Sequence, residues 1–174
     1  MTQDRRDQAI DNFELYEDSV NFLGVASVDL PNLAFLTQIL NGSGIGGNIT
    51  AVMVGQMEEM STTVHWRNLT NESASLSTPK RHALDLRAAL QVEDPINNRI
   101  EFRAIKHVMV VIPKSITGGK LAPASTGDAG SEYAVRYWAF YIDGVRQWEV
   151  DPFNHKLEVN GVDYTADIRR ALGH

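Results

Sequence analysis

The stretch YAVRYWAFYIDGVRQWEV, from Tyr133 to Val150, predicts a β-hairpin and indicates a fold built mainly from strands. Its Asp143-Gly144 dipeptide favours a two-residue type I′ turn, because both central positions of that turn need a positive φ. The first strand of the hairpin carries apolar or aromatic side chains on both faces. In a small domain this pattern predicts that something else covers one of the two faces.

Other segments alternate between polar and apolar residues, as half-buried strands do. VASVDLPNL (residues 25–33) alternates until it meets Pro31, which is typical of an edge strand or a strand end. RIEFRA (residues 99–104) alternates as well, and the phase then changes near Ala104 and Ile105. The following KHVMVVI is apolar on both faces, which indicates a bulge or a strand covered on both sides.

Two segments predict helices, and one predicts a long loop. TPKRHALDLRAAL (residues 78–90) offers Thr78 as N-cap, Pro79 in the first turn and an apolar stripe, so we expect a helix there. A second, short helix is predicted at YTADIRRAL near the C-terminus. Residues 114–132 are rich in Gly, Ser, Ala and Pro and are too many for an ordinary connection, so we expect a long polar loop.

Size and composition limit the classes of function. A chain of 174 residues most simply forms a single domain over residues 1–174, and without cysteine it has no disulfides or thiolate zinc sites. Its net charge is −6 and its Lys and Arg are scattered, so specific nucleic-acid binding is not expected. The polar N-terminus does not resemble a signal peptide, and no apolar run approaches the roughly 20 residues of a membrane span. We therefore expect no membrane insertion by this chain.

LNGSGIGGNIT, from Leu40 to Thr50, spells the G-x-G-x-x-G of dinucleotide sites with Gly42, Gly44 and Gly47. A dinucleotide site needs a strand before these glycines and a helix that begins within them, so that the pyrophosphate meets the helix N-terminus. Here the following residues are poor helix formers, and the chain lacks βαβ alternation. We expect a pliable loop between strands, and this context argues against the alternative of a nucleotide-binding enzyme.

No residue pattern indicates catalysis, a cofactor or a metal. The five histidines lack the close spacing that brings two imidazoles to one metal, and Asp151 with His155 has no plausible nucleophile beside it. We therefore expect no enzyme, no cofactor and no metal site. A set of aromatic residues leaves a carbohydrate-binding β-sandwich module as an alternative function, although such a set is more often core or subunit interface. The set comprises Tyr137, Trp138, Phe140, Tyr141 and Trp148.

Both ends of the chain resemble the phage major tail tube family of P2-type contractile tails. That family runs from a Gly-Val-Ala strand into a Leu-Pro-x-Leu segment and a glycine-rich loop. The matching residues here are Gly24-Val25-Ala26, Leu30-Pro31-x-Leu33 and Gly42 to Gly47. The closing Val-Asn-Gly-Val-Asp of the family matches Val159 to Asp163, which a short basic segment follows. The departures are a polar N-terminal extension, residues 1–11, and the loop at residues 114–132.

The resemblance implies an antiparallel β-sandwich or barrel with one flanking α-helix and long assembly loops. It implies hexameric rings that stack into the inner tube of a contractile phage tail, or of a related bacteriocin or secretion-system particle. The implied partners are further copies of the chain, the tail sheath protein, the tape-measure protein, and the baseplate and tail terminator proteins. DNA would pass through without specific binding. The implied location is the virion tail or a tail-like particle, synthesised and assembled in the bacterial host cytoplasm.

Inter-subunit candidates come from the segments that carry the resemblance. They are Leu30, Pro31, Leu33, Gly42, Gly44, Ile45, Gly47, Ile49, Val159, Asn160 and Gly161. Intramolecular turn and strand roles for the same residues are an equally good interpretation. Because the chain is acidic, we also hypothesise that acidic residues line the lumen, where they would repel DNA evenly and let it slide.

Overall fold

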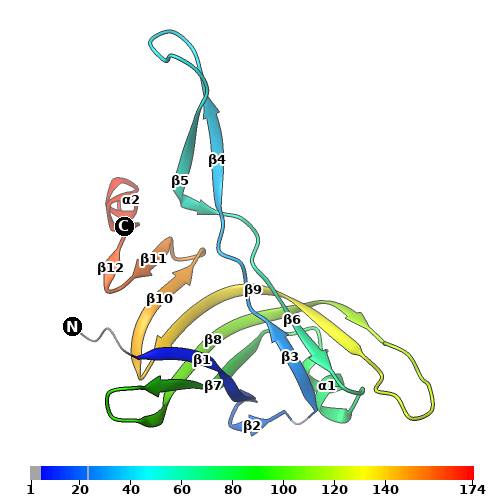
Figure 1. The fold of residues 1–174 in the computed structure, drawn as a ribbon. Coiled ribbons are helices and arrows are strands. Elements are labelled where there is room, and N and C mark those ends of the chain that lie inside the picture. The colour runs from blue at the N-terminus through cyan, green and yellow to red at the C-terminus, as the bar shows by residue number, and fades with distance from the viewer. Residues whose placement is uncertain (1–4, 23) are drawn as a thin grey trace.

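The computed structural model describes residues 5–22 and 24–174 and consists mainly of antiparallel strands (Figure 1). The strands are β1 (Arg6–Glu17), β2 (Val20–Asn21), β3 (Val25–Asp29), β4 (Phe35–Leu40), β5 (Ile49–Met57), β6 (Ser61–Trp66), β7 (His82–Asp94), β8 (Arg99–Thr117), β9 (Ala129–Ile142), β10 (Val145–Asp151), β11 (Lys156–Val159) and β12 (Val162–Asp163). The helices are α1 (Asn71–Leu76) and α2 (Ala166–Ala171).

Ten strands form one sheet that branches at β9. The main path runs β12-β11-β10-β9-β8-β7-β1-β2, while β6 pairs with β9 and β3 pairs with β6. The first half of β9 pairs with β6, from Ala129 to Ala134, and the second half pairs with β10, from Trp138 to Ile142. The described strands make sandwich-like layers, and the sheet does not close into a barrel. Figure 1 shows β3, β6 and α1 lying across the curved sheet of β1, β7, β8 and β9.

The hairpin predicted around Asp143-Gly144 is confirmed. β9 and β10 pair with Ile142 opposite Val145, and the two turn residues have φ of 48° and 79°. Oδ1 of Asp143 also accepts a hydrogen bond from the backbone N–H of Ala104 at 2.9 Å, which fixes the turn against β8. The dipeptide therefore supplies both the backbone conformation and a tertiary contact.

The helix predicted at residues 78–90 is wrong, because most of that segment is strand β7. Leu84, Leu86 and Val92 alternate with half-buried or exposed neighbours, which is the period of a strand. β7 gains its hydrogen bonds from β1 on one side and β8 on the other, and this pairing overrides local helix propensity. The flanking helix is instead α1, which Thr70 caps by accepting a hydrogen bond from the N–H of Ser73. The short C-terminal helix is present as α2.

The phase change near Ala104 and Ile105 predicted a bulge or a strand covered on both sides, and the bulge is wrong. RIEFRA and KHVMVVI belong to the single long strand β8, which pairs with β7 without a shift of register. The shifts lie in its pairing with β9, between Val110 and Val111 and between Pro113 and Ser115. Alternate residues of β8 from His107 to Val111 are buried, and those between them are half-buried, so the core covers one face more completely than the other.

Two segments expected to be loop or extension contribute to the sheet. β8 runs to Thr117 and β9 begins at Ala129, so the connection is shorter than the predicted loop at residues 114–132. Within it, the N–H of Gly127 donates to the backbone oxygen of Arg67 at 2.7 Å. Of the predicted N-terminal extension, residues 1–4 lie outside the described part of the chain, and Arg6 onward belongs to β1, which pairs with β7.

The core lies between the branches of the sheet and α1. Its largest fully buried side chains include Trp66, Tyr133, Leu15, Leu84 and Met109, which come from five different strands. A buried polar contact also joins separate elements of the body. His82 Nδ1 lies 2.6 Å from a carboxylate oxygen of Glu17, and its Nε2 lies 2.9 Å from the backbone oxygen of Thr78.

Candidate assembly surfaces

β4, β5 and the loop 41–48 between them form a projecting hairpin, which we call the arm. β4 and β5 pair with each other as a separate two-stranded sheet, from Phe35 opposite Met57 to Leu40 opposite Ile49. In Figure 1 the arm extends away from the rest of the molecule. A two-stranded hairpin is marginally stable in water by itself, and its unpaired edges can accept another strand.

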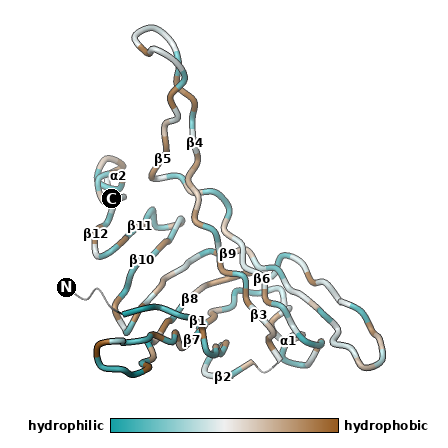
Figure 2. Tube along the Cα trace, viewed as in Figure 1, coloured by the Kyte–Doolittle hydropathy of each residue, from teal (hydrophilic) through white to brown (hydrophobic). Residues whose placement is uncertain are grey.

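The arm is uncharged and carries exposed apolar side chains. No Asp, Glu, Lys or Arg occurs between Asp29 and Glu58. Leu40 and Ile49 are directly paired and share a face, beyond a register shift that lies between Phe35 and Thr37. Alternation along each strand places Leu36 and Met53 on the same face, which we call the apolar face of the arm. The exposed fractions of these four side chains range from 45% to 55%. Figure 2 shows hydrophobic residues recurring along both strands of the arm.

The exposed area of the whole chain is large for its mass. The structure exposes 11145 Å², whereas a compact monomer of 19.3 kDa exposes about 8,500 Å². The surplus is comparable to the area that obligate interfaces bury. A surface of this size, with an uncharged arm, is typical of a subunit that completes its packing against other molecules.

The glycine-rich residues form the tip of the arm. Gly42 and Gly44 adopt φ of 133° and 87°, conformations that favour glycine, and Gly47 precedes β5. The segment after these glycines is a strand, so the loop has no helix N-terminus for a pyrophosphate and is a connection between strands, as expected. Ile45 is half-buried within this loop, and Ile49 lies on the apolar face of the arm.

The Leu-Pro-x-Leu segment leads from the body into the arm. Leu30 is 44% exposed, Pro31 is buried, and Leu33 is half-buried against the core. At the base of the arm, a Cβ added to Gly55 would lie 2.6 Å from Cδ1 of Ile168 in α2. The arm therefore leaves the body through a packed base.

Leu30 and Pro31 also line an uncharged groove of about 580 Å³ in the body, which we call the apolar groove. Its walls come from β1, β3, β7, β8, β9 and β10, and none of its lining residues is Asp, Glu, Lys or Arg. Sequence reasoning did not identify this groove, because its residues are scattered over six strands. The uncharged run from Leu30 to Met57 was the available signal for the arm.

The floor of the apolar groove is a cluster of aromatic rings. His107 stacks on Phe140 with ring centroids 4.6 Å apart, and Trp148 lies 5.1 Å from Trp138 and 4.4 Å from Phe140. Burial lowers the pKa of His107 to about 4, so the ring is neutral at physiological pH. Its Nδ1 accepts a hydrogen bond from Nε1 of Trp138 at 3.2 Å. The buried Nε1 of Trp148 has no hydrogen-bond partner within the described residues.

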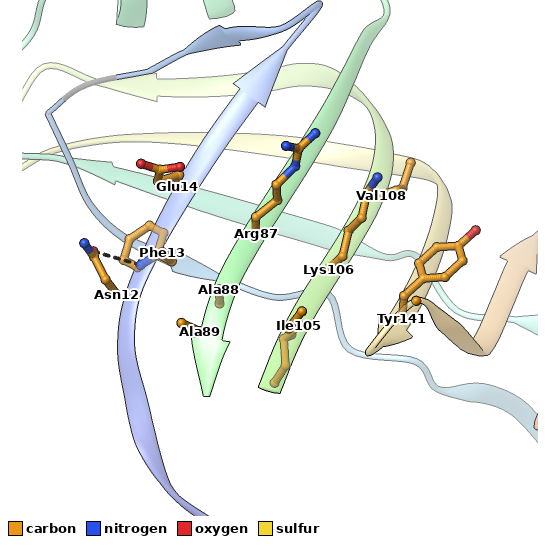
Figure 3. Close-up of a pocket in the computed structure, with 12 residues that line it drawn as sticks. Asn12, Phe13, Glu14, Arg87, Ala88, Ala89, Ile105, Lys106, Val108 and Tyr141 are labelled. Carbon is orange, nitrogen blue, oxygen red and sulfur yellow. Dashed lines mark hydrogen bonds between the residues drawn. The ribbon is translucent and has the colours of Figure 1, made fainter. Parts of the chain in front are cut away.

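The opposite face of the same strands is charged (Figure 3). Glu14, Arg87, Lys106 and Tyr141 lie opposite one another on β1, β7, β8 and β9, beside a shallow depression of about 660 Å³. Asp85 accepts a hydrogen bond from Arg87 at 2.7 Å and pairs with Lys106 at 3.3 Å. The two faces of the sheet thus differ sharply in polarity.

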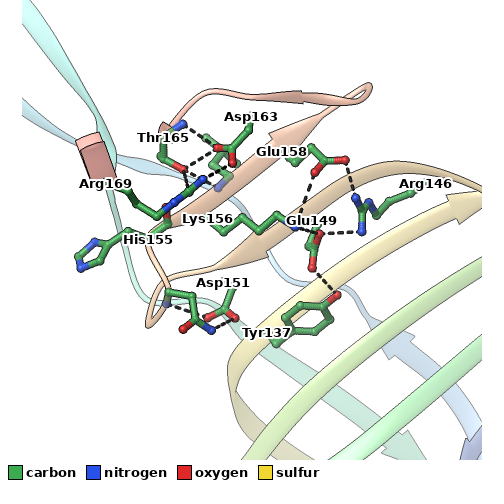
Figure 4. A network of polar contacts seen from close by, with 12 residues as sticks. Tyr137, Arg146, Glu149, Asp151, His155, Lys156, Glu158, Asp163, Thr165 and Arg169 are labelled. Carbon is green, nitrogen blue, oxygen red and sulfur yellow. Dashed lines mark hydrogen bonds and ion pairs between the residues drawn. The ribbon is translucent and has the colours of Figure 1, made fainter. Parts of the chain in front are cut away.

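A polar network holds β9, β10 and β11 together (Figure 4). Glu149 accepts hydrogen bonds from Tyr137 at 2.9 Å and from Lys156 at 2.6 Å, and pairs with Arg146 at 2.8 Å. Burial raises the pKa of Glu149, but the bonds from Lys156 and Tyr137 outweigh that effect and hold it below its usual value. This network stabilises the subunit internally.

The C-terminal candidates form a turn between β11 and β12. Asn160 and Gly161 have φ of 49° and 80°, and the N–H of Asn160 donates to the backbone oxygen of Gln147 at 2.7 Å. Val159 pairs with both Trp148 and Val162. Their intramolecular contacts account for this conformation.

The next element, α2, is held by an ion pair. Arg169 donates a hydrogen bond to Asp163 at 2.6 Å, and this bond lowers the pKa of Asp163 to about 2. Arg169 also donates to the backbone oxygen of His155 at 2.8 Å. The helix that packs against the base of the arm is therefore fastened to the body.

The structure gives the alternative functions little support. Trp138 is only 5% exposed, so its ring is not available for stacking on a sugar. Asp151 accepts hydrogen bonds from the N–H and the side chain of Asn154, within its own turn. Among residues 5–22 and 24–174, no three His, Asp or Glu side chains gather as a metal site requires. No helix in the described part of the chain is long and apolar enough to cross a membrane.

The fold and these surfaces define an antiparallel β-sandwich subunit with a projecting arm. A family model described as phage tail tube protein FII matches residues 7–173. The chain belongs to this family of phage tail tube proteins, as the resemblance of its two ends predicted.

A solved structure with the same fold comes from a contractile injection system. It is a chain from the cryo-EM structure of an extracellular contractile injection system, the PVC sheath/tube terminator in its extended state. The TM-score is 0.52 at 8% sequence identity, and the match covers 75% of this chain and 94% of that one. At this identity the likeness concerns the fold alone. A comparison with curated protein sequences finds no match.

Proposed function

We propose that this chain assembles as stacked hexameric rings into the inner tube of a contractile phage tail or phage-tail-like particle. The tube is a conduit for DNA or for puncturing an envelope, and its function is geometric, without enzymatic turnover. The observation that carries the proposal is the uncharged arm, whose apolar side chains remain exposed in a chain that belongs to the tail tube family.

In the proposed assembly, each copy of the chain covers exposed apolar area of a neighbouring copy. The arm and the surface that receives it are different patches, so one contact joins two copies head to tail. Such a contact makes a ring when its rotation closes, and further contacts stack the rings. Ring formation also pairs edge strands that are open in the single subunit, such as much of the outer edge of β1.

The inter-subunit residues we propose lie mainly on the arm and at its base. They are Leu30, Pro31, Leu33, Gly42, Gly44, Ile45, Gly47 and Ile49, with Val159, Asn160 and Gly161 as a second contact at the β11–β12 turn. A further apolar patch at the β7–β8 turn supplies a third contact, because Ile96, Ile100 and Phe102 are 58% to 74% exposed.

The proposed partners are further copies of the chain, the sheath protein, a tape-measure protein, and baseplate and terminator proteins. The family match over residues 7–173 supports these partners, and the chain shares its fold with a sheath/tube terminator of a contractile injection system. We place the chain in the virion tail or tail-like particle, after synthesis and assembly in the bacterial host cytoplasm. DNA passes through the tube without specific binding.

The acidic charge of the chain motivates a proposal about the lumen. With a net charge of −6 per copy, a lumen lined by acidic side chains repels DNA along its whole length, so that the DNA slides. A cryo-EM map of the assembled tube tests this proposal. A neutral or basic lumen would contradict it without affecting the assembly proposal.

Negative-stain electron microscopy at rising protein concentration, beside size-exclusion chromatography, tests the tube function. We expect rings or hollow tubes. If the protein remains monomeric, assembly is repeated with baseplate components from a related particle as a primer. A monomer under both conditions would overturn the tube function.

A further inference from the structure

We propose that the apolar groove of one copy receives the apolar face of the arm of another copy. This inference rests on the proposed tube function and goes beyond it by naming both surfaces of one contact. Leu36, Leu40, Ile49 and Met53 supply the inserted face, and the aromatic floor with Phe140 and Trp148 receives it.

The chemistry of the two surfaces matches. The arm has no charged residue between Asp29 and Glu58, and none of the groove's lining residues is Asp, Glu, Lys or Arg. Burial keeps the one titratable ring of the floor, His107, neutral. Contact therefore removes apolar area from water without burying a charge, which would be costly without a partner.

The arm is directed away from the groove of its own chain. Leu30 and Pro31 at the groove lead into the arm, which then extends outward from the body (Figure 1). Ile168 of α2 packs against Gly55 at the base of the arm. A second copy is therefore the occupant that the geometry favours. The surplus of exposed area, set against about 8,500 Å² for a compact monomer, is of the size that an obligate contact between copies removes.

Photo-crosslinking tests this contact directly, because the chain has no native cysteine. Asn48→Cys places a benzophenone maleimide at the tip of the arm and leaves all four side chains of the apolar face intact. Unlabelled and ¹⁵N-labelled copies are mixed, assembled and irradiated, and the crosslinked peptides are identified by mass spectrometry. We expect mixed-isotope crosslinks to peptides of β1, β3 or β10 that line the groove. Val20→Cys, at an exposed position of β2 outside the groove, is the control.

Three outcomes separate the proposals. Tubes whose arm crosslinks to the groove of another copy support the inference. Tubes whose arm crosslinks elsewhere, or only within its own copy, overturn the inference and leave the tube function standing. Failure of the unlabelled wild-type chain to form rings or tubes, even with a primer, overturns the tube function.

A pair of substitutions provides a second readout. Ile10 lines the groove and is 47% exposed, so Ile10→Glu leaves the monomer folded and places a charge where the arm inserts. We expect the protein concentration needed for assembly to rise about tenfold or more, since about 1.4 kcal/mol corresponds to a factor of ten. Val20→Glu, at 56% exposure in β2, serves as the matched control. Equal assembly by both variants, with circular dichroism confirming that they fold, would overturn the inference.

Discussion

Trp66 in the body is 1% exposed on a strand that pairs with β3 and β9, whereas Ile39 in the arm is 60% exposed on a strand that pairs only with β5. Both residues lie in β-strands. The body buries its apolar side chains between layers of its own strands, whereas the apolar side chains of the arm are exposed to solvent. The sequence thus encodes a body that buries its own core and an arm whose apolar side chains the described part of the chain leaves exposed.

The two regions also differ in charge. In the body, ionic groups pair with one another, as in the network around Glu149 and in the pair formed by Asp163 and Arg169. The arm has no ionic group at all between Asp29 and Glu58. Charged residues are depleted at the centres of protein interfaces because their desolvation is costly. The composition of the arm is therefore that of an interface core.

The largest expected loss of unfolding free energy comes from a substitution in the core of the body. Trp66→Ala removes a ring that is 1% exposed, and we expect it to lower the free energy of unfolding by about 3–5 kcal/mol. Ile39→Ala should change it by no more than about 0.5 kcal/mol, because the Ile39 side chain is exposed. Urea denaturation of the monomer measures both. Equal losses would show that the arm shares in the core, and the contrast between the two regions would fail.

The pH dependence of stability should come from the body, and His107 makes a large contribution. Burial lowers the pKa of His107 from 6.5 to about 4, so the unfolded chain binds a proton at a higher pH than the folded one. Stability is therefore highest above about pH 6.5 and falls by roughly 3 kcal/mol as the pH drops toward 4. Urea denaturation across this window measures the loss.

His107→Phe is the matched variant for this experiment, because it keeps a ring against Phe140 and removes the titration. The difference in unfolding free energy between the wild-type protein and His107→Phe should change by roughly 3 kcal/mol between pH 7 and pH 4. A difference that stays constant from pH 7 to pH 4 would contradict a buried neutral histidine. Substitutions in the arm should leave the pH profile unchanged, since the arm has no titratable residue between Asp29 and Glu58.

An intermediate effect on stability is expected from replacing glycine in the body, and a glycine of similar backbone conformation in the arm provides the comparison. Gly144 in the body has φ of 79° and Gly44 at the tip of the arm has φ of 87°, and a Cβ at either position meets no atom within 4 Å. Gly144→Ala should cost about 1–2 kcal/mol, because alanine in a left-handed conformation is strained. Gly44→Ala should leave the urea midpoint unchanged, since we expect the separate two-stranded sheet of the arm to unfold without the body. The opposite order of effects would place the arm within the cooperative unit.

The smallest expected effect on stability accompanies the largest effect on assembly. Ile49→Glu replaces a side chain that is 55% exposed, so the unfolding free energy of the monomer should change by no more than about 0.5 kcal/mol. Rings and tubes should nevertheless be lost, because a charge enters the apolar face of the arm. Negative-stain microscopy beside urea denaturation measures both. If Ile49→Glu forms normal tubes, the apolar face of the arm is not part of the interface between copies.

Local chemistry in the sequence predicted several elements correctly. Asp143-Gly144 predicts its turn from backbone conformation, and the glycines from Gly42 to Gly47 lack the context of a nucleotide site and lie between strands. The segment at residues 78–90 was mispredicted because Leu84, Leu86 and Leu90 fit both a helical stripe and a strand with alternate residues buried. Pairing with β1 and β8 decided between them, and a local pattern contains no information about partners distant in the chain.

The candidate site could be predicted only in part. The glycine loop and the Leu30-Pro31 segment were identified from their family pattern, and both belong to the arm or to its base. The apolar groove could not be identified, because Phe13, Ile105 and Trp148 are brought together by strand pairings that only the fold shows. The apolar character of the groove depends on which alternate side chains of each strand face it, and the register of those strands could not be predicted from the sequence.

The division of β9 between β6 and β10 has a mechanical consequence. Because one continuous strand is hydrogen-bonded into both branches of the sheet, the branches cannot shear past each other without breaking ladder bonds from Ala129 to Ile142. A load applied to the subunit is thus spread over many bonds in parallel. In a tube driven forward by a contracting sheath, each body would transmit thrust as a stiff block, and bending would concentrate in the arms between blocks.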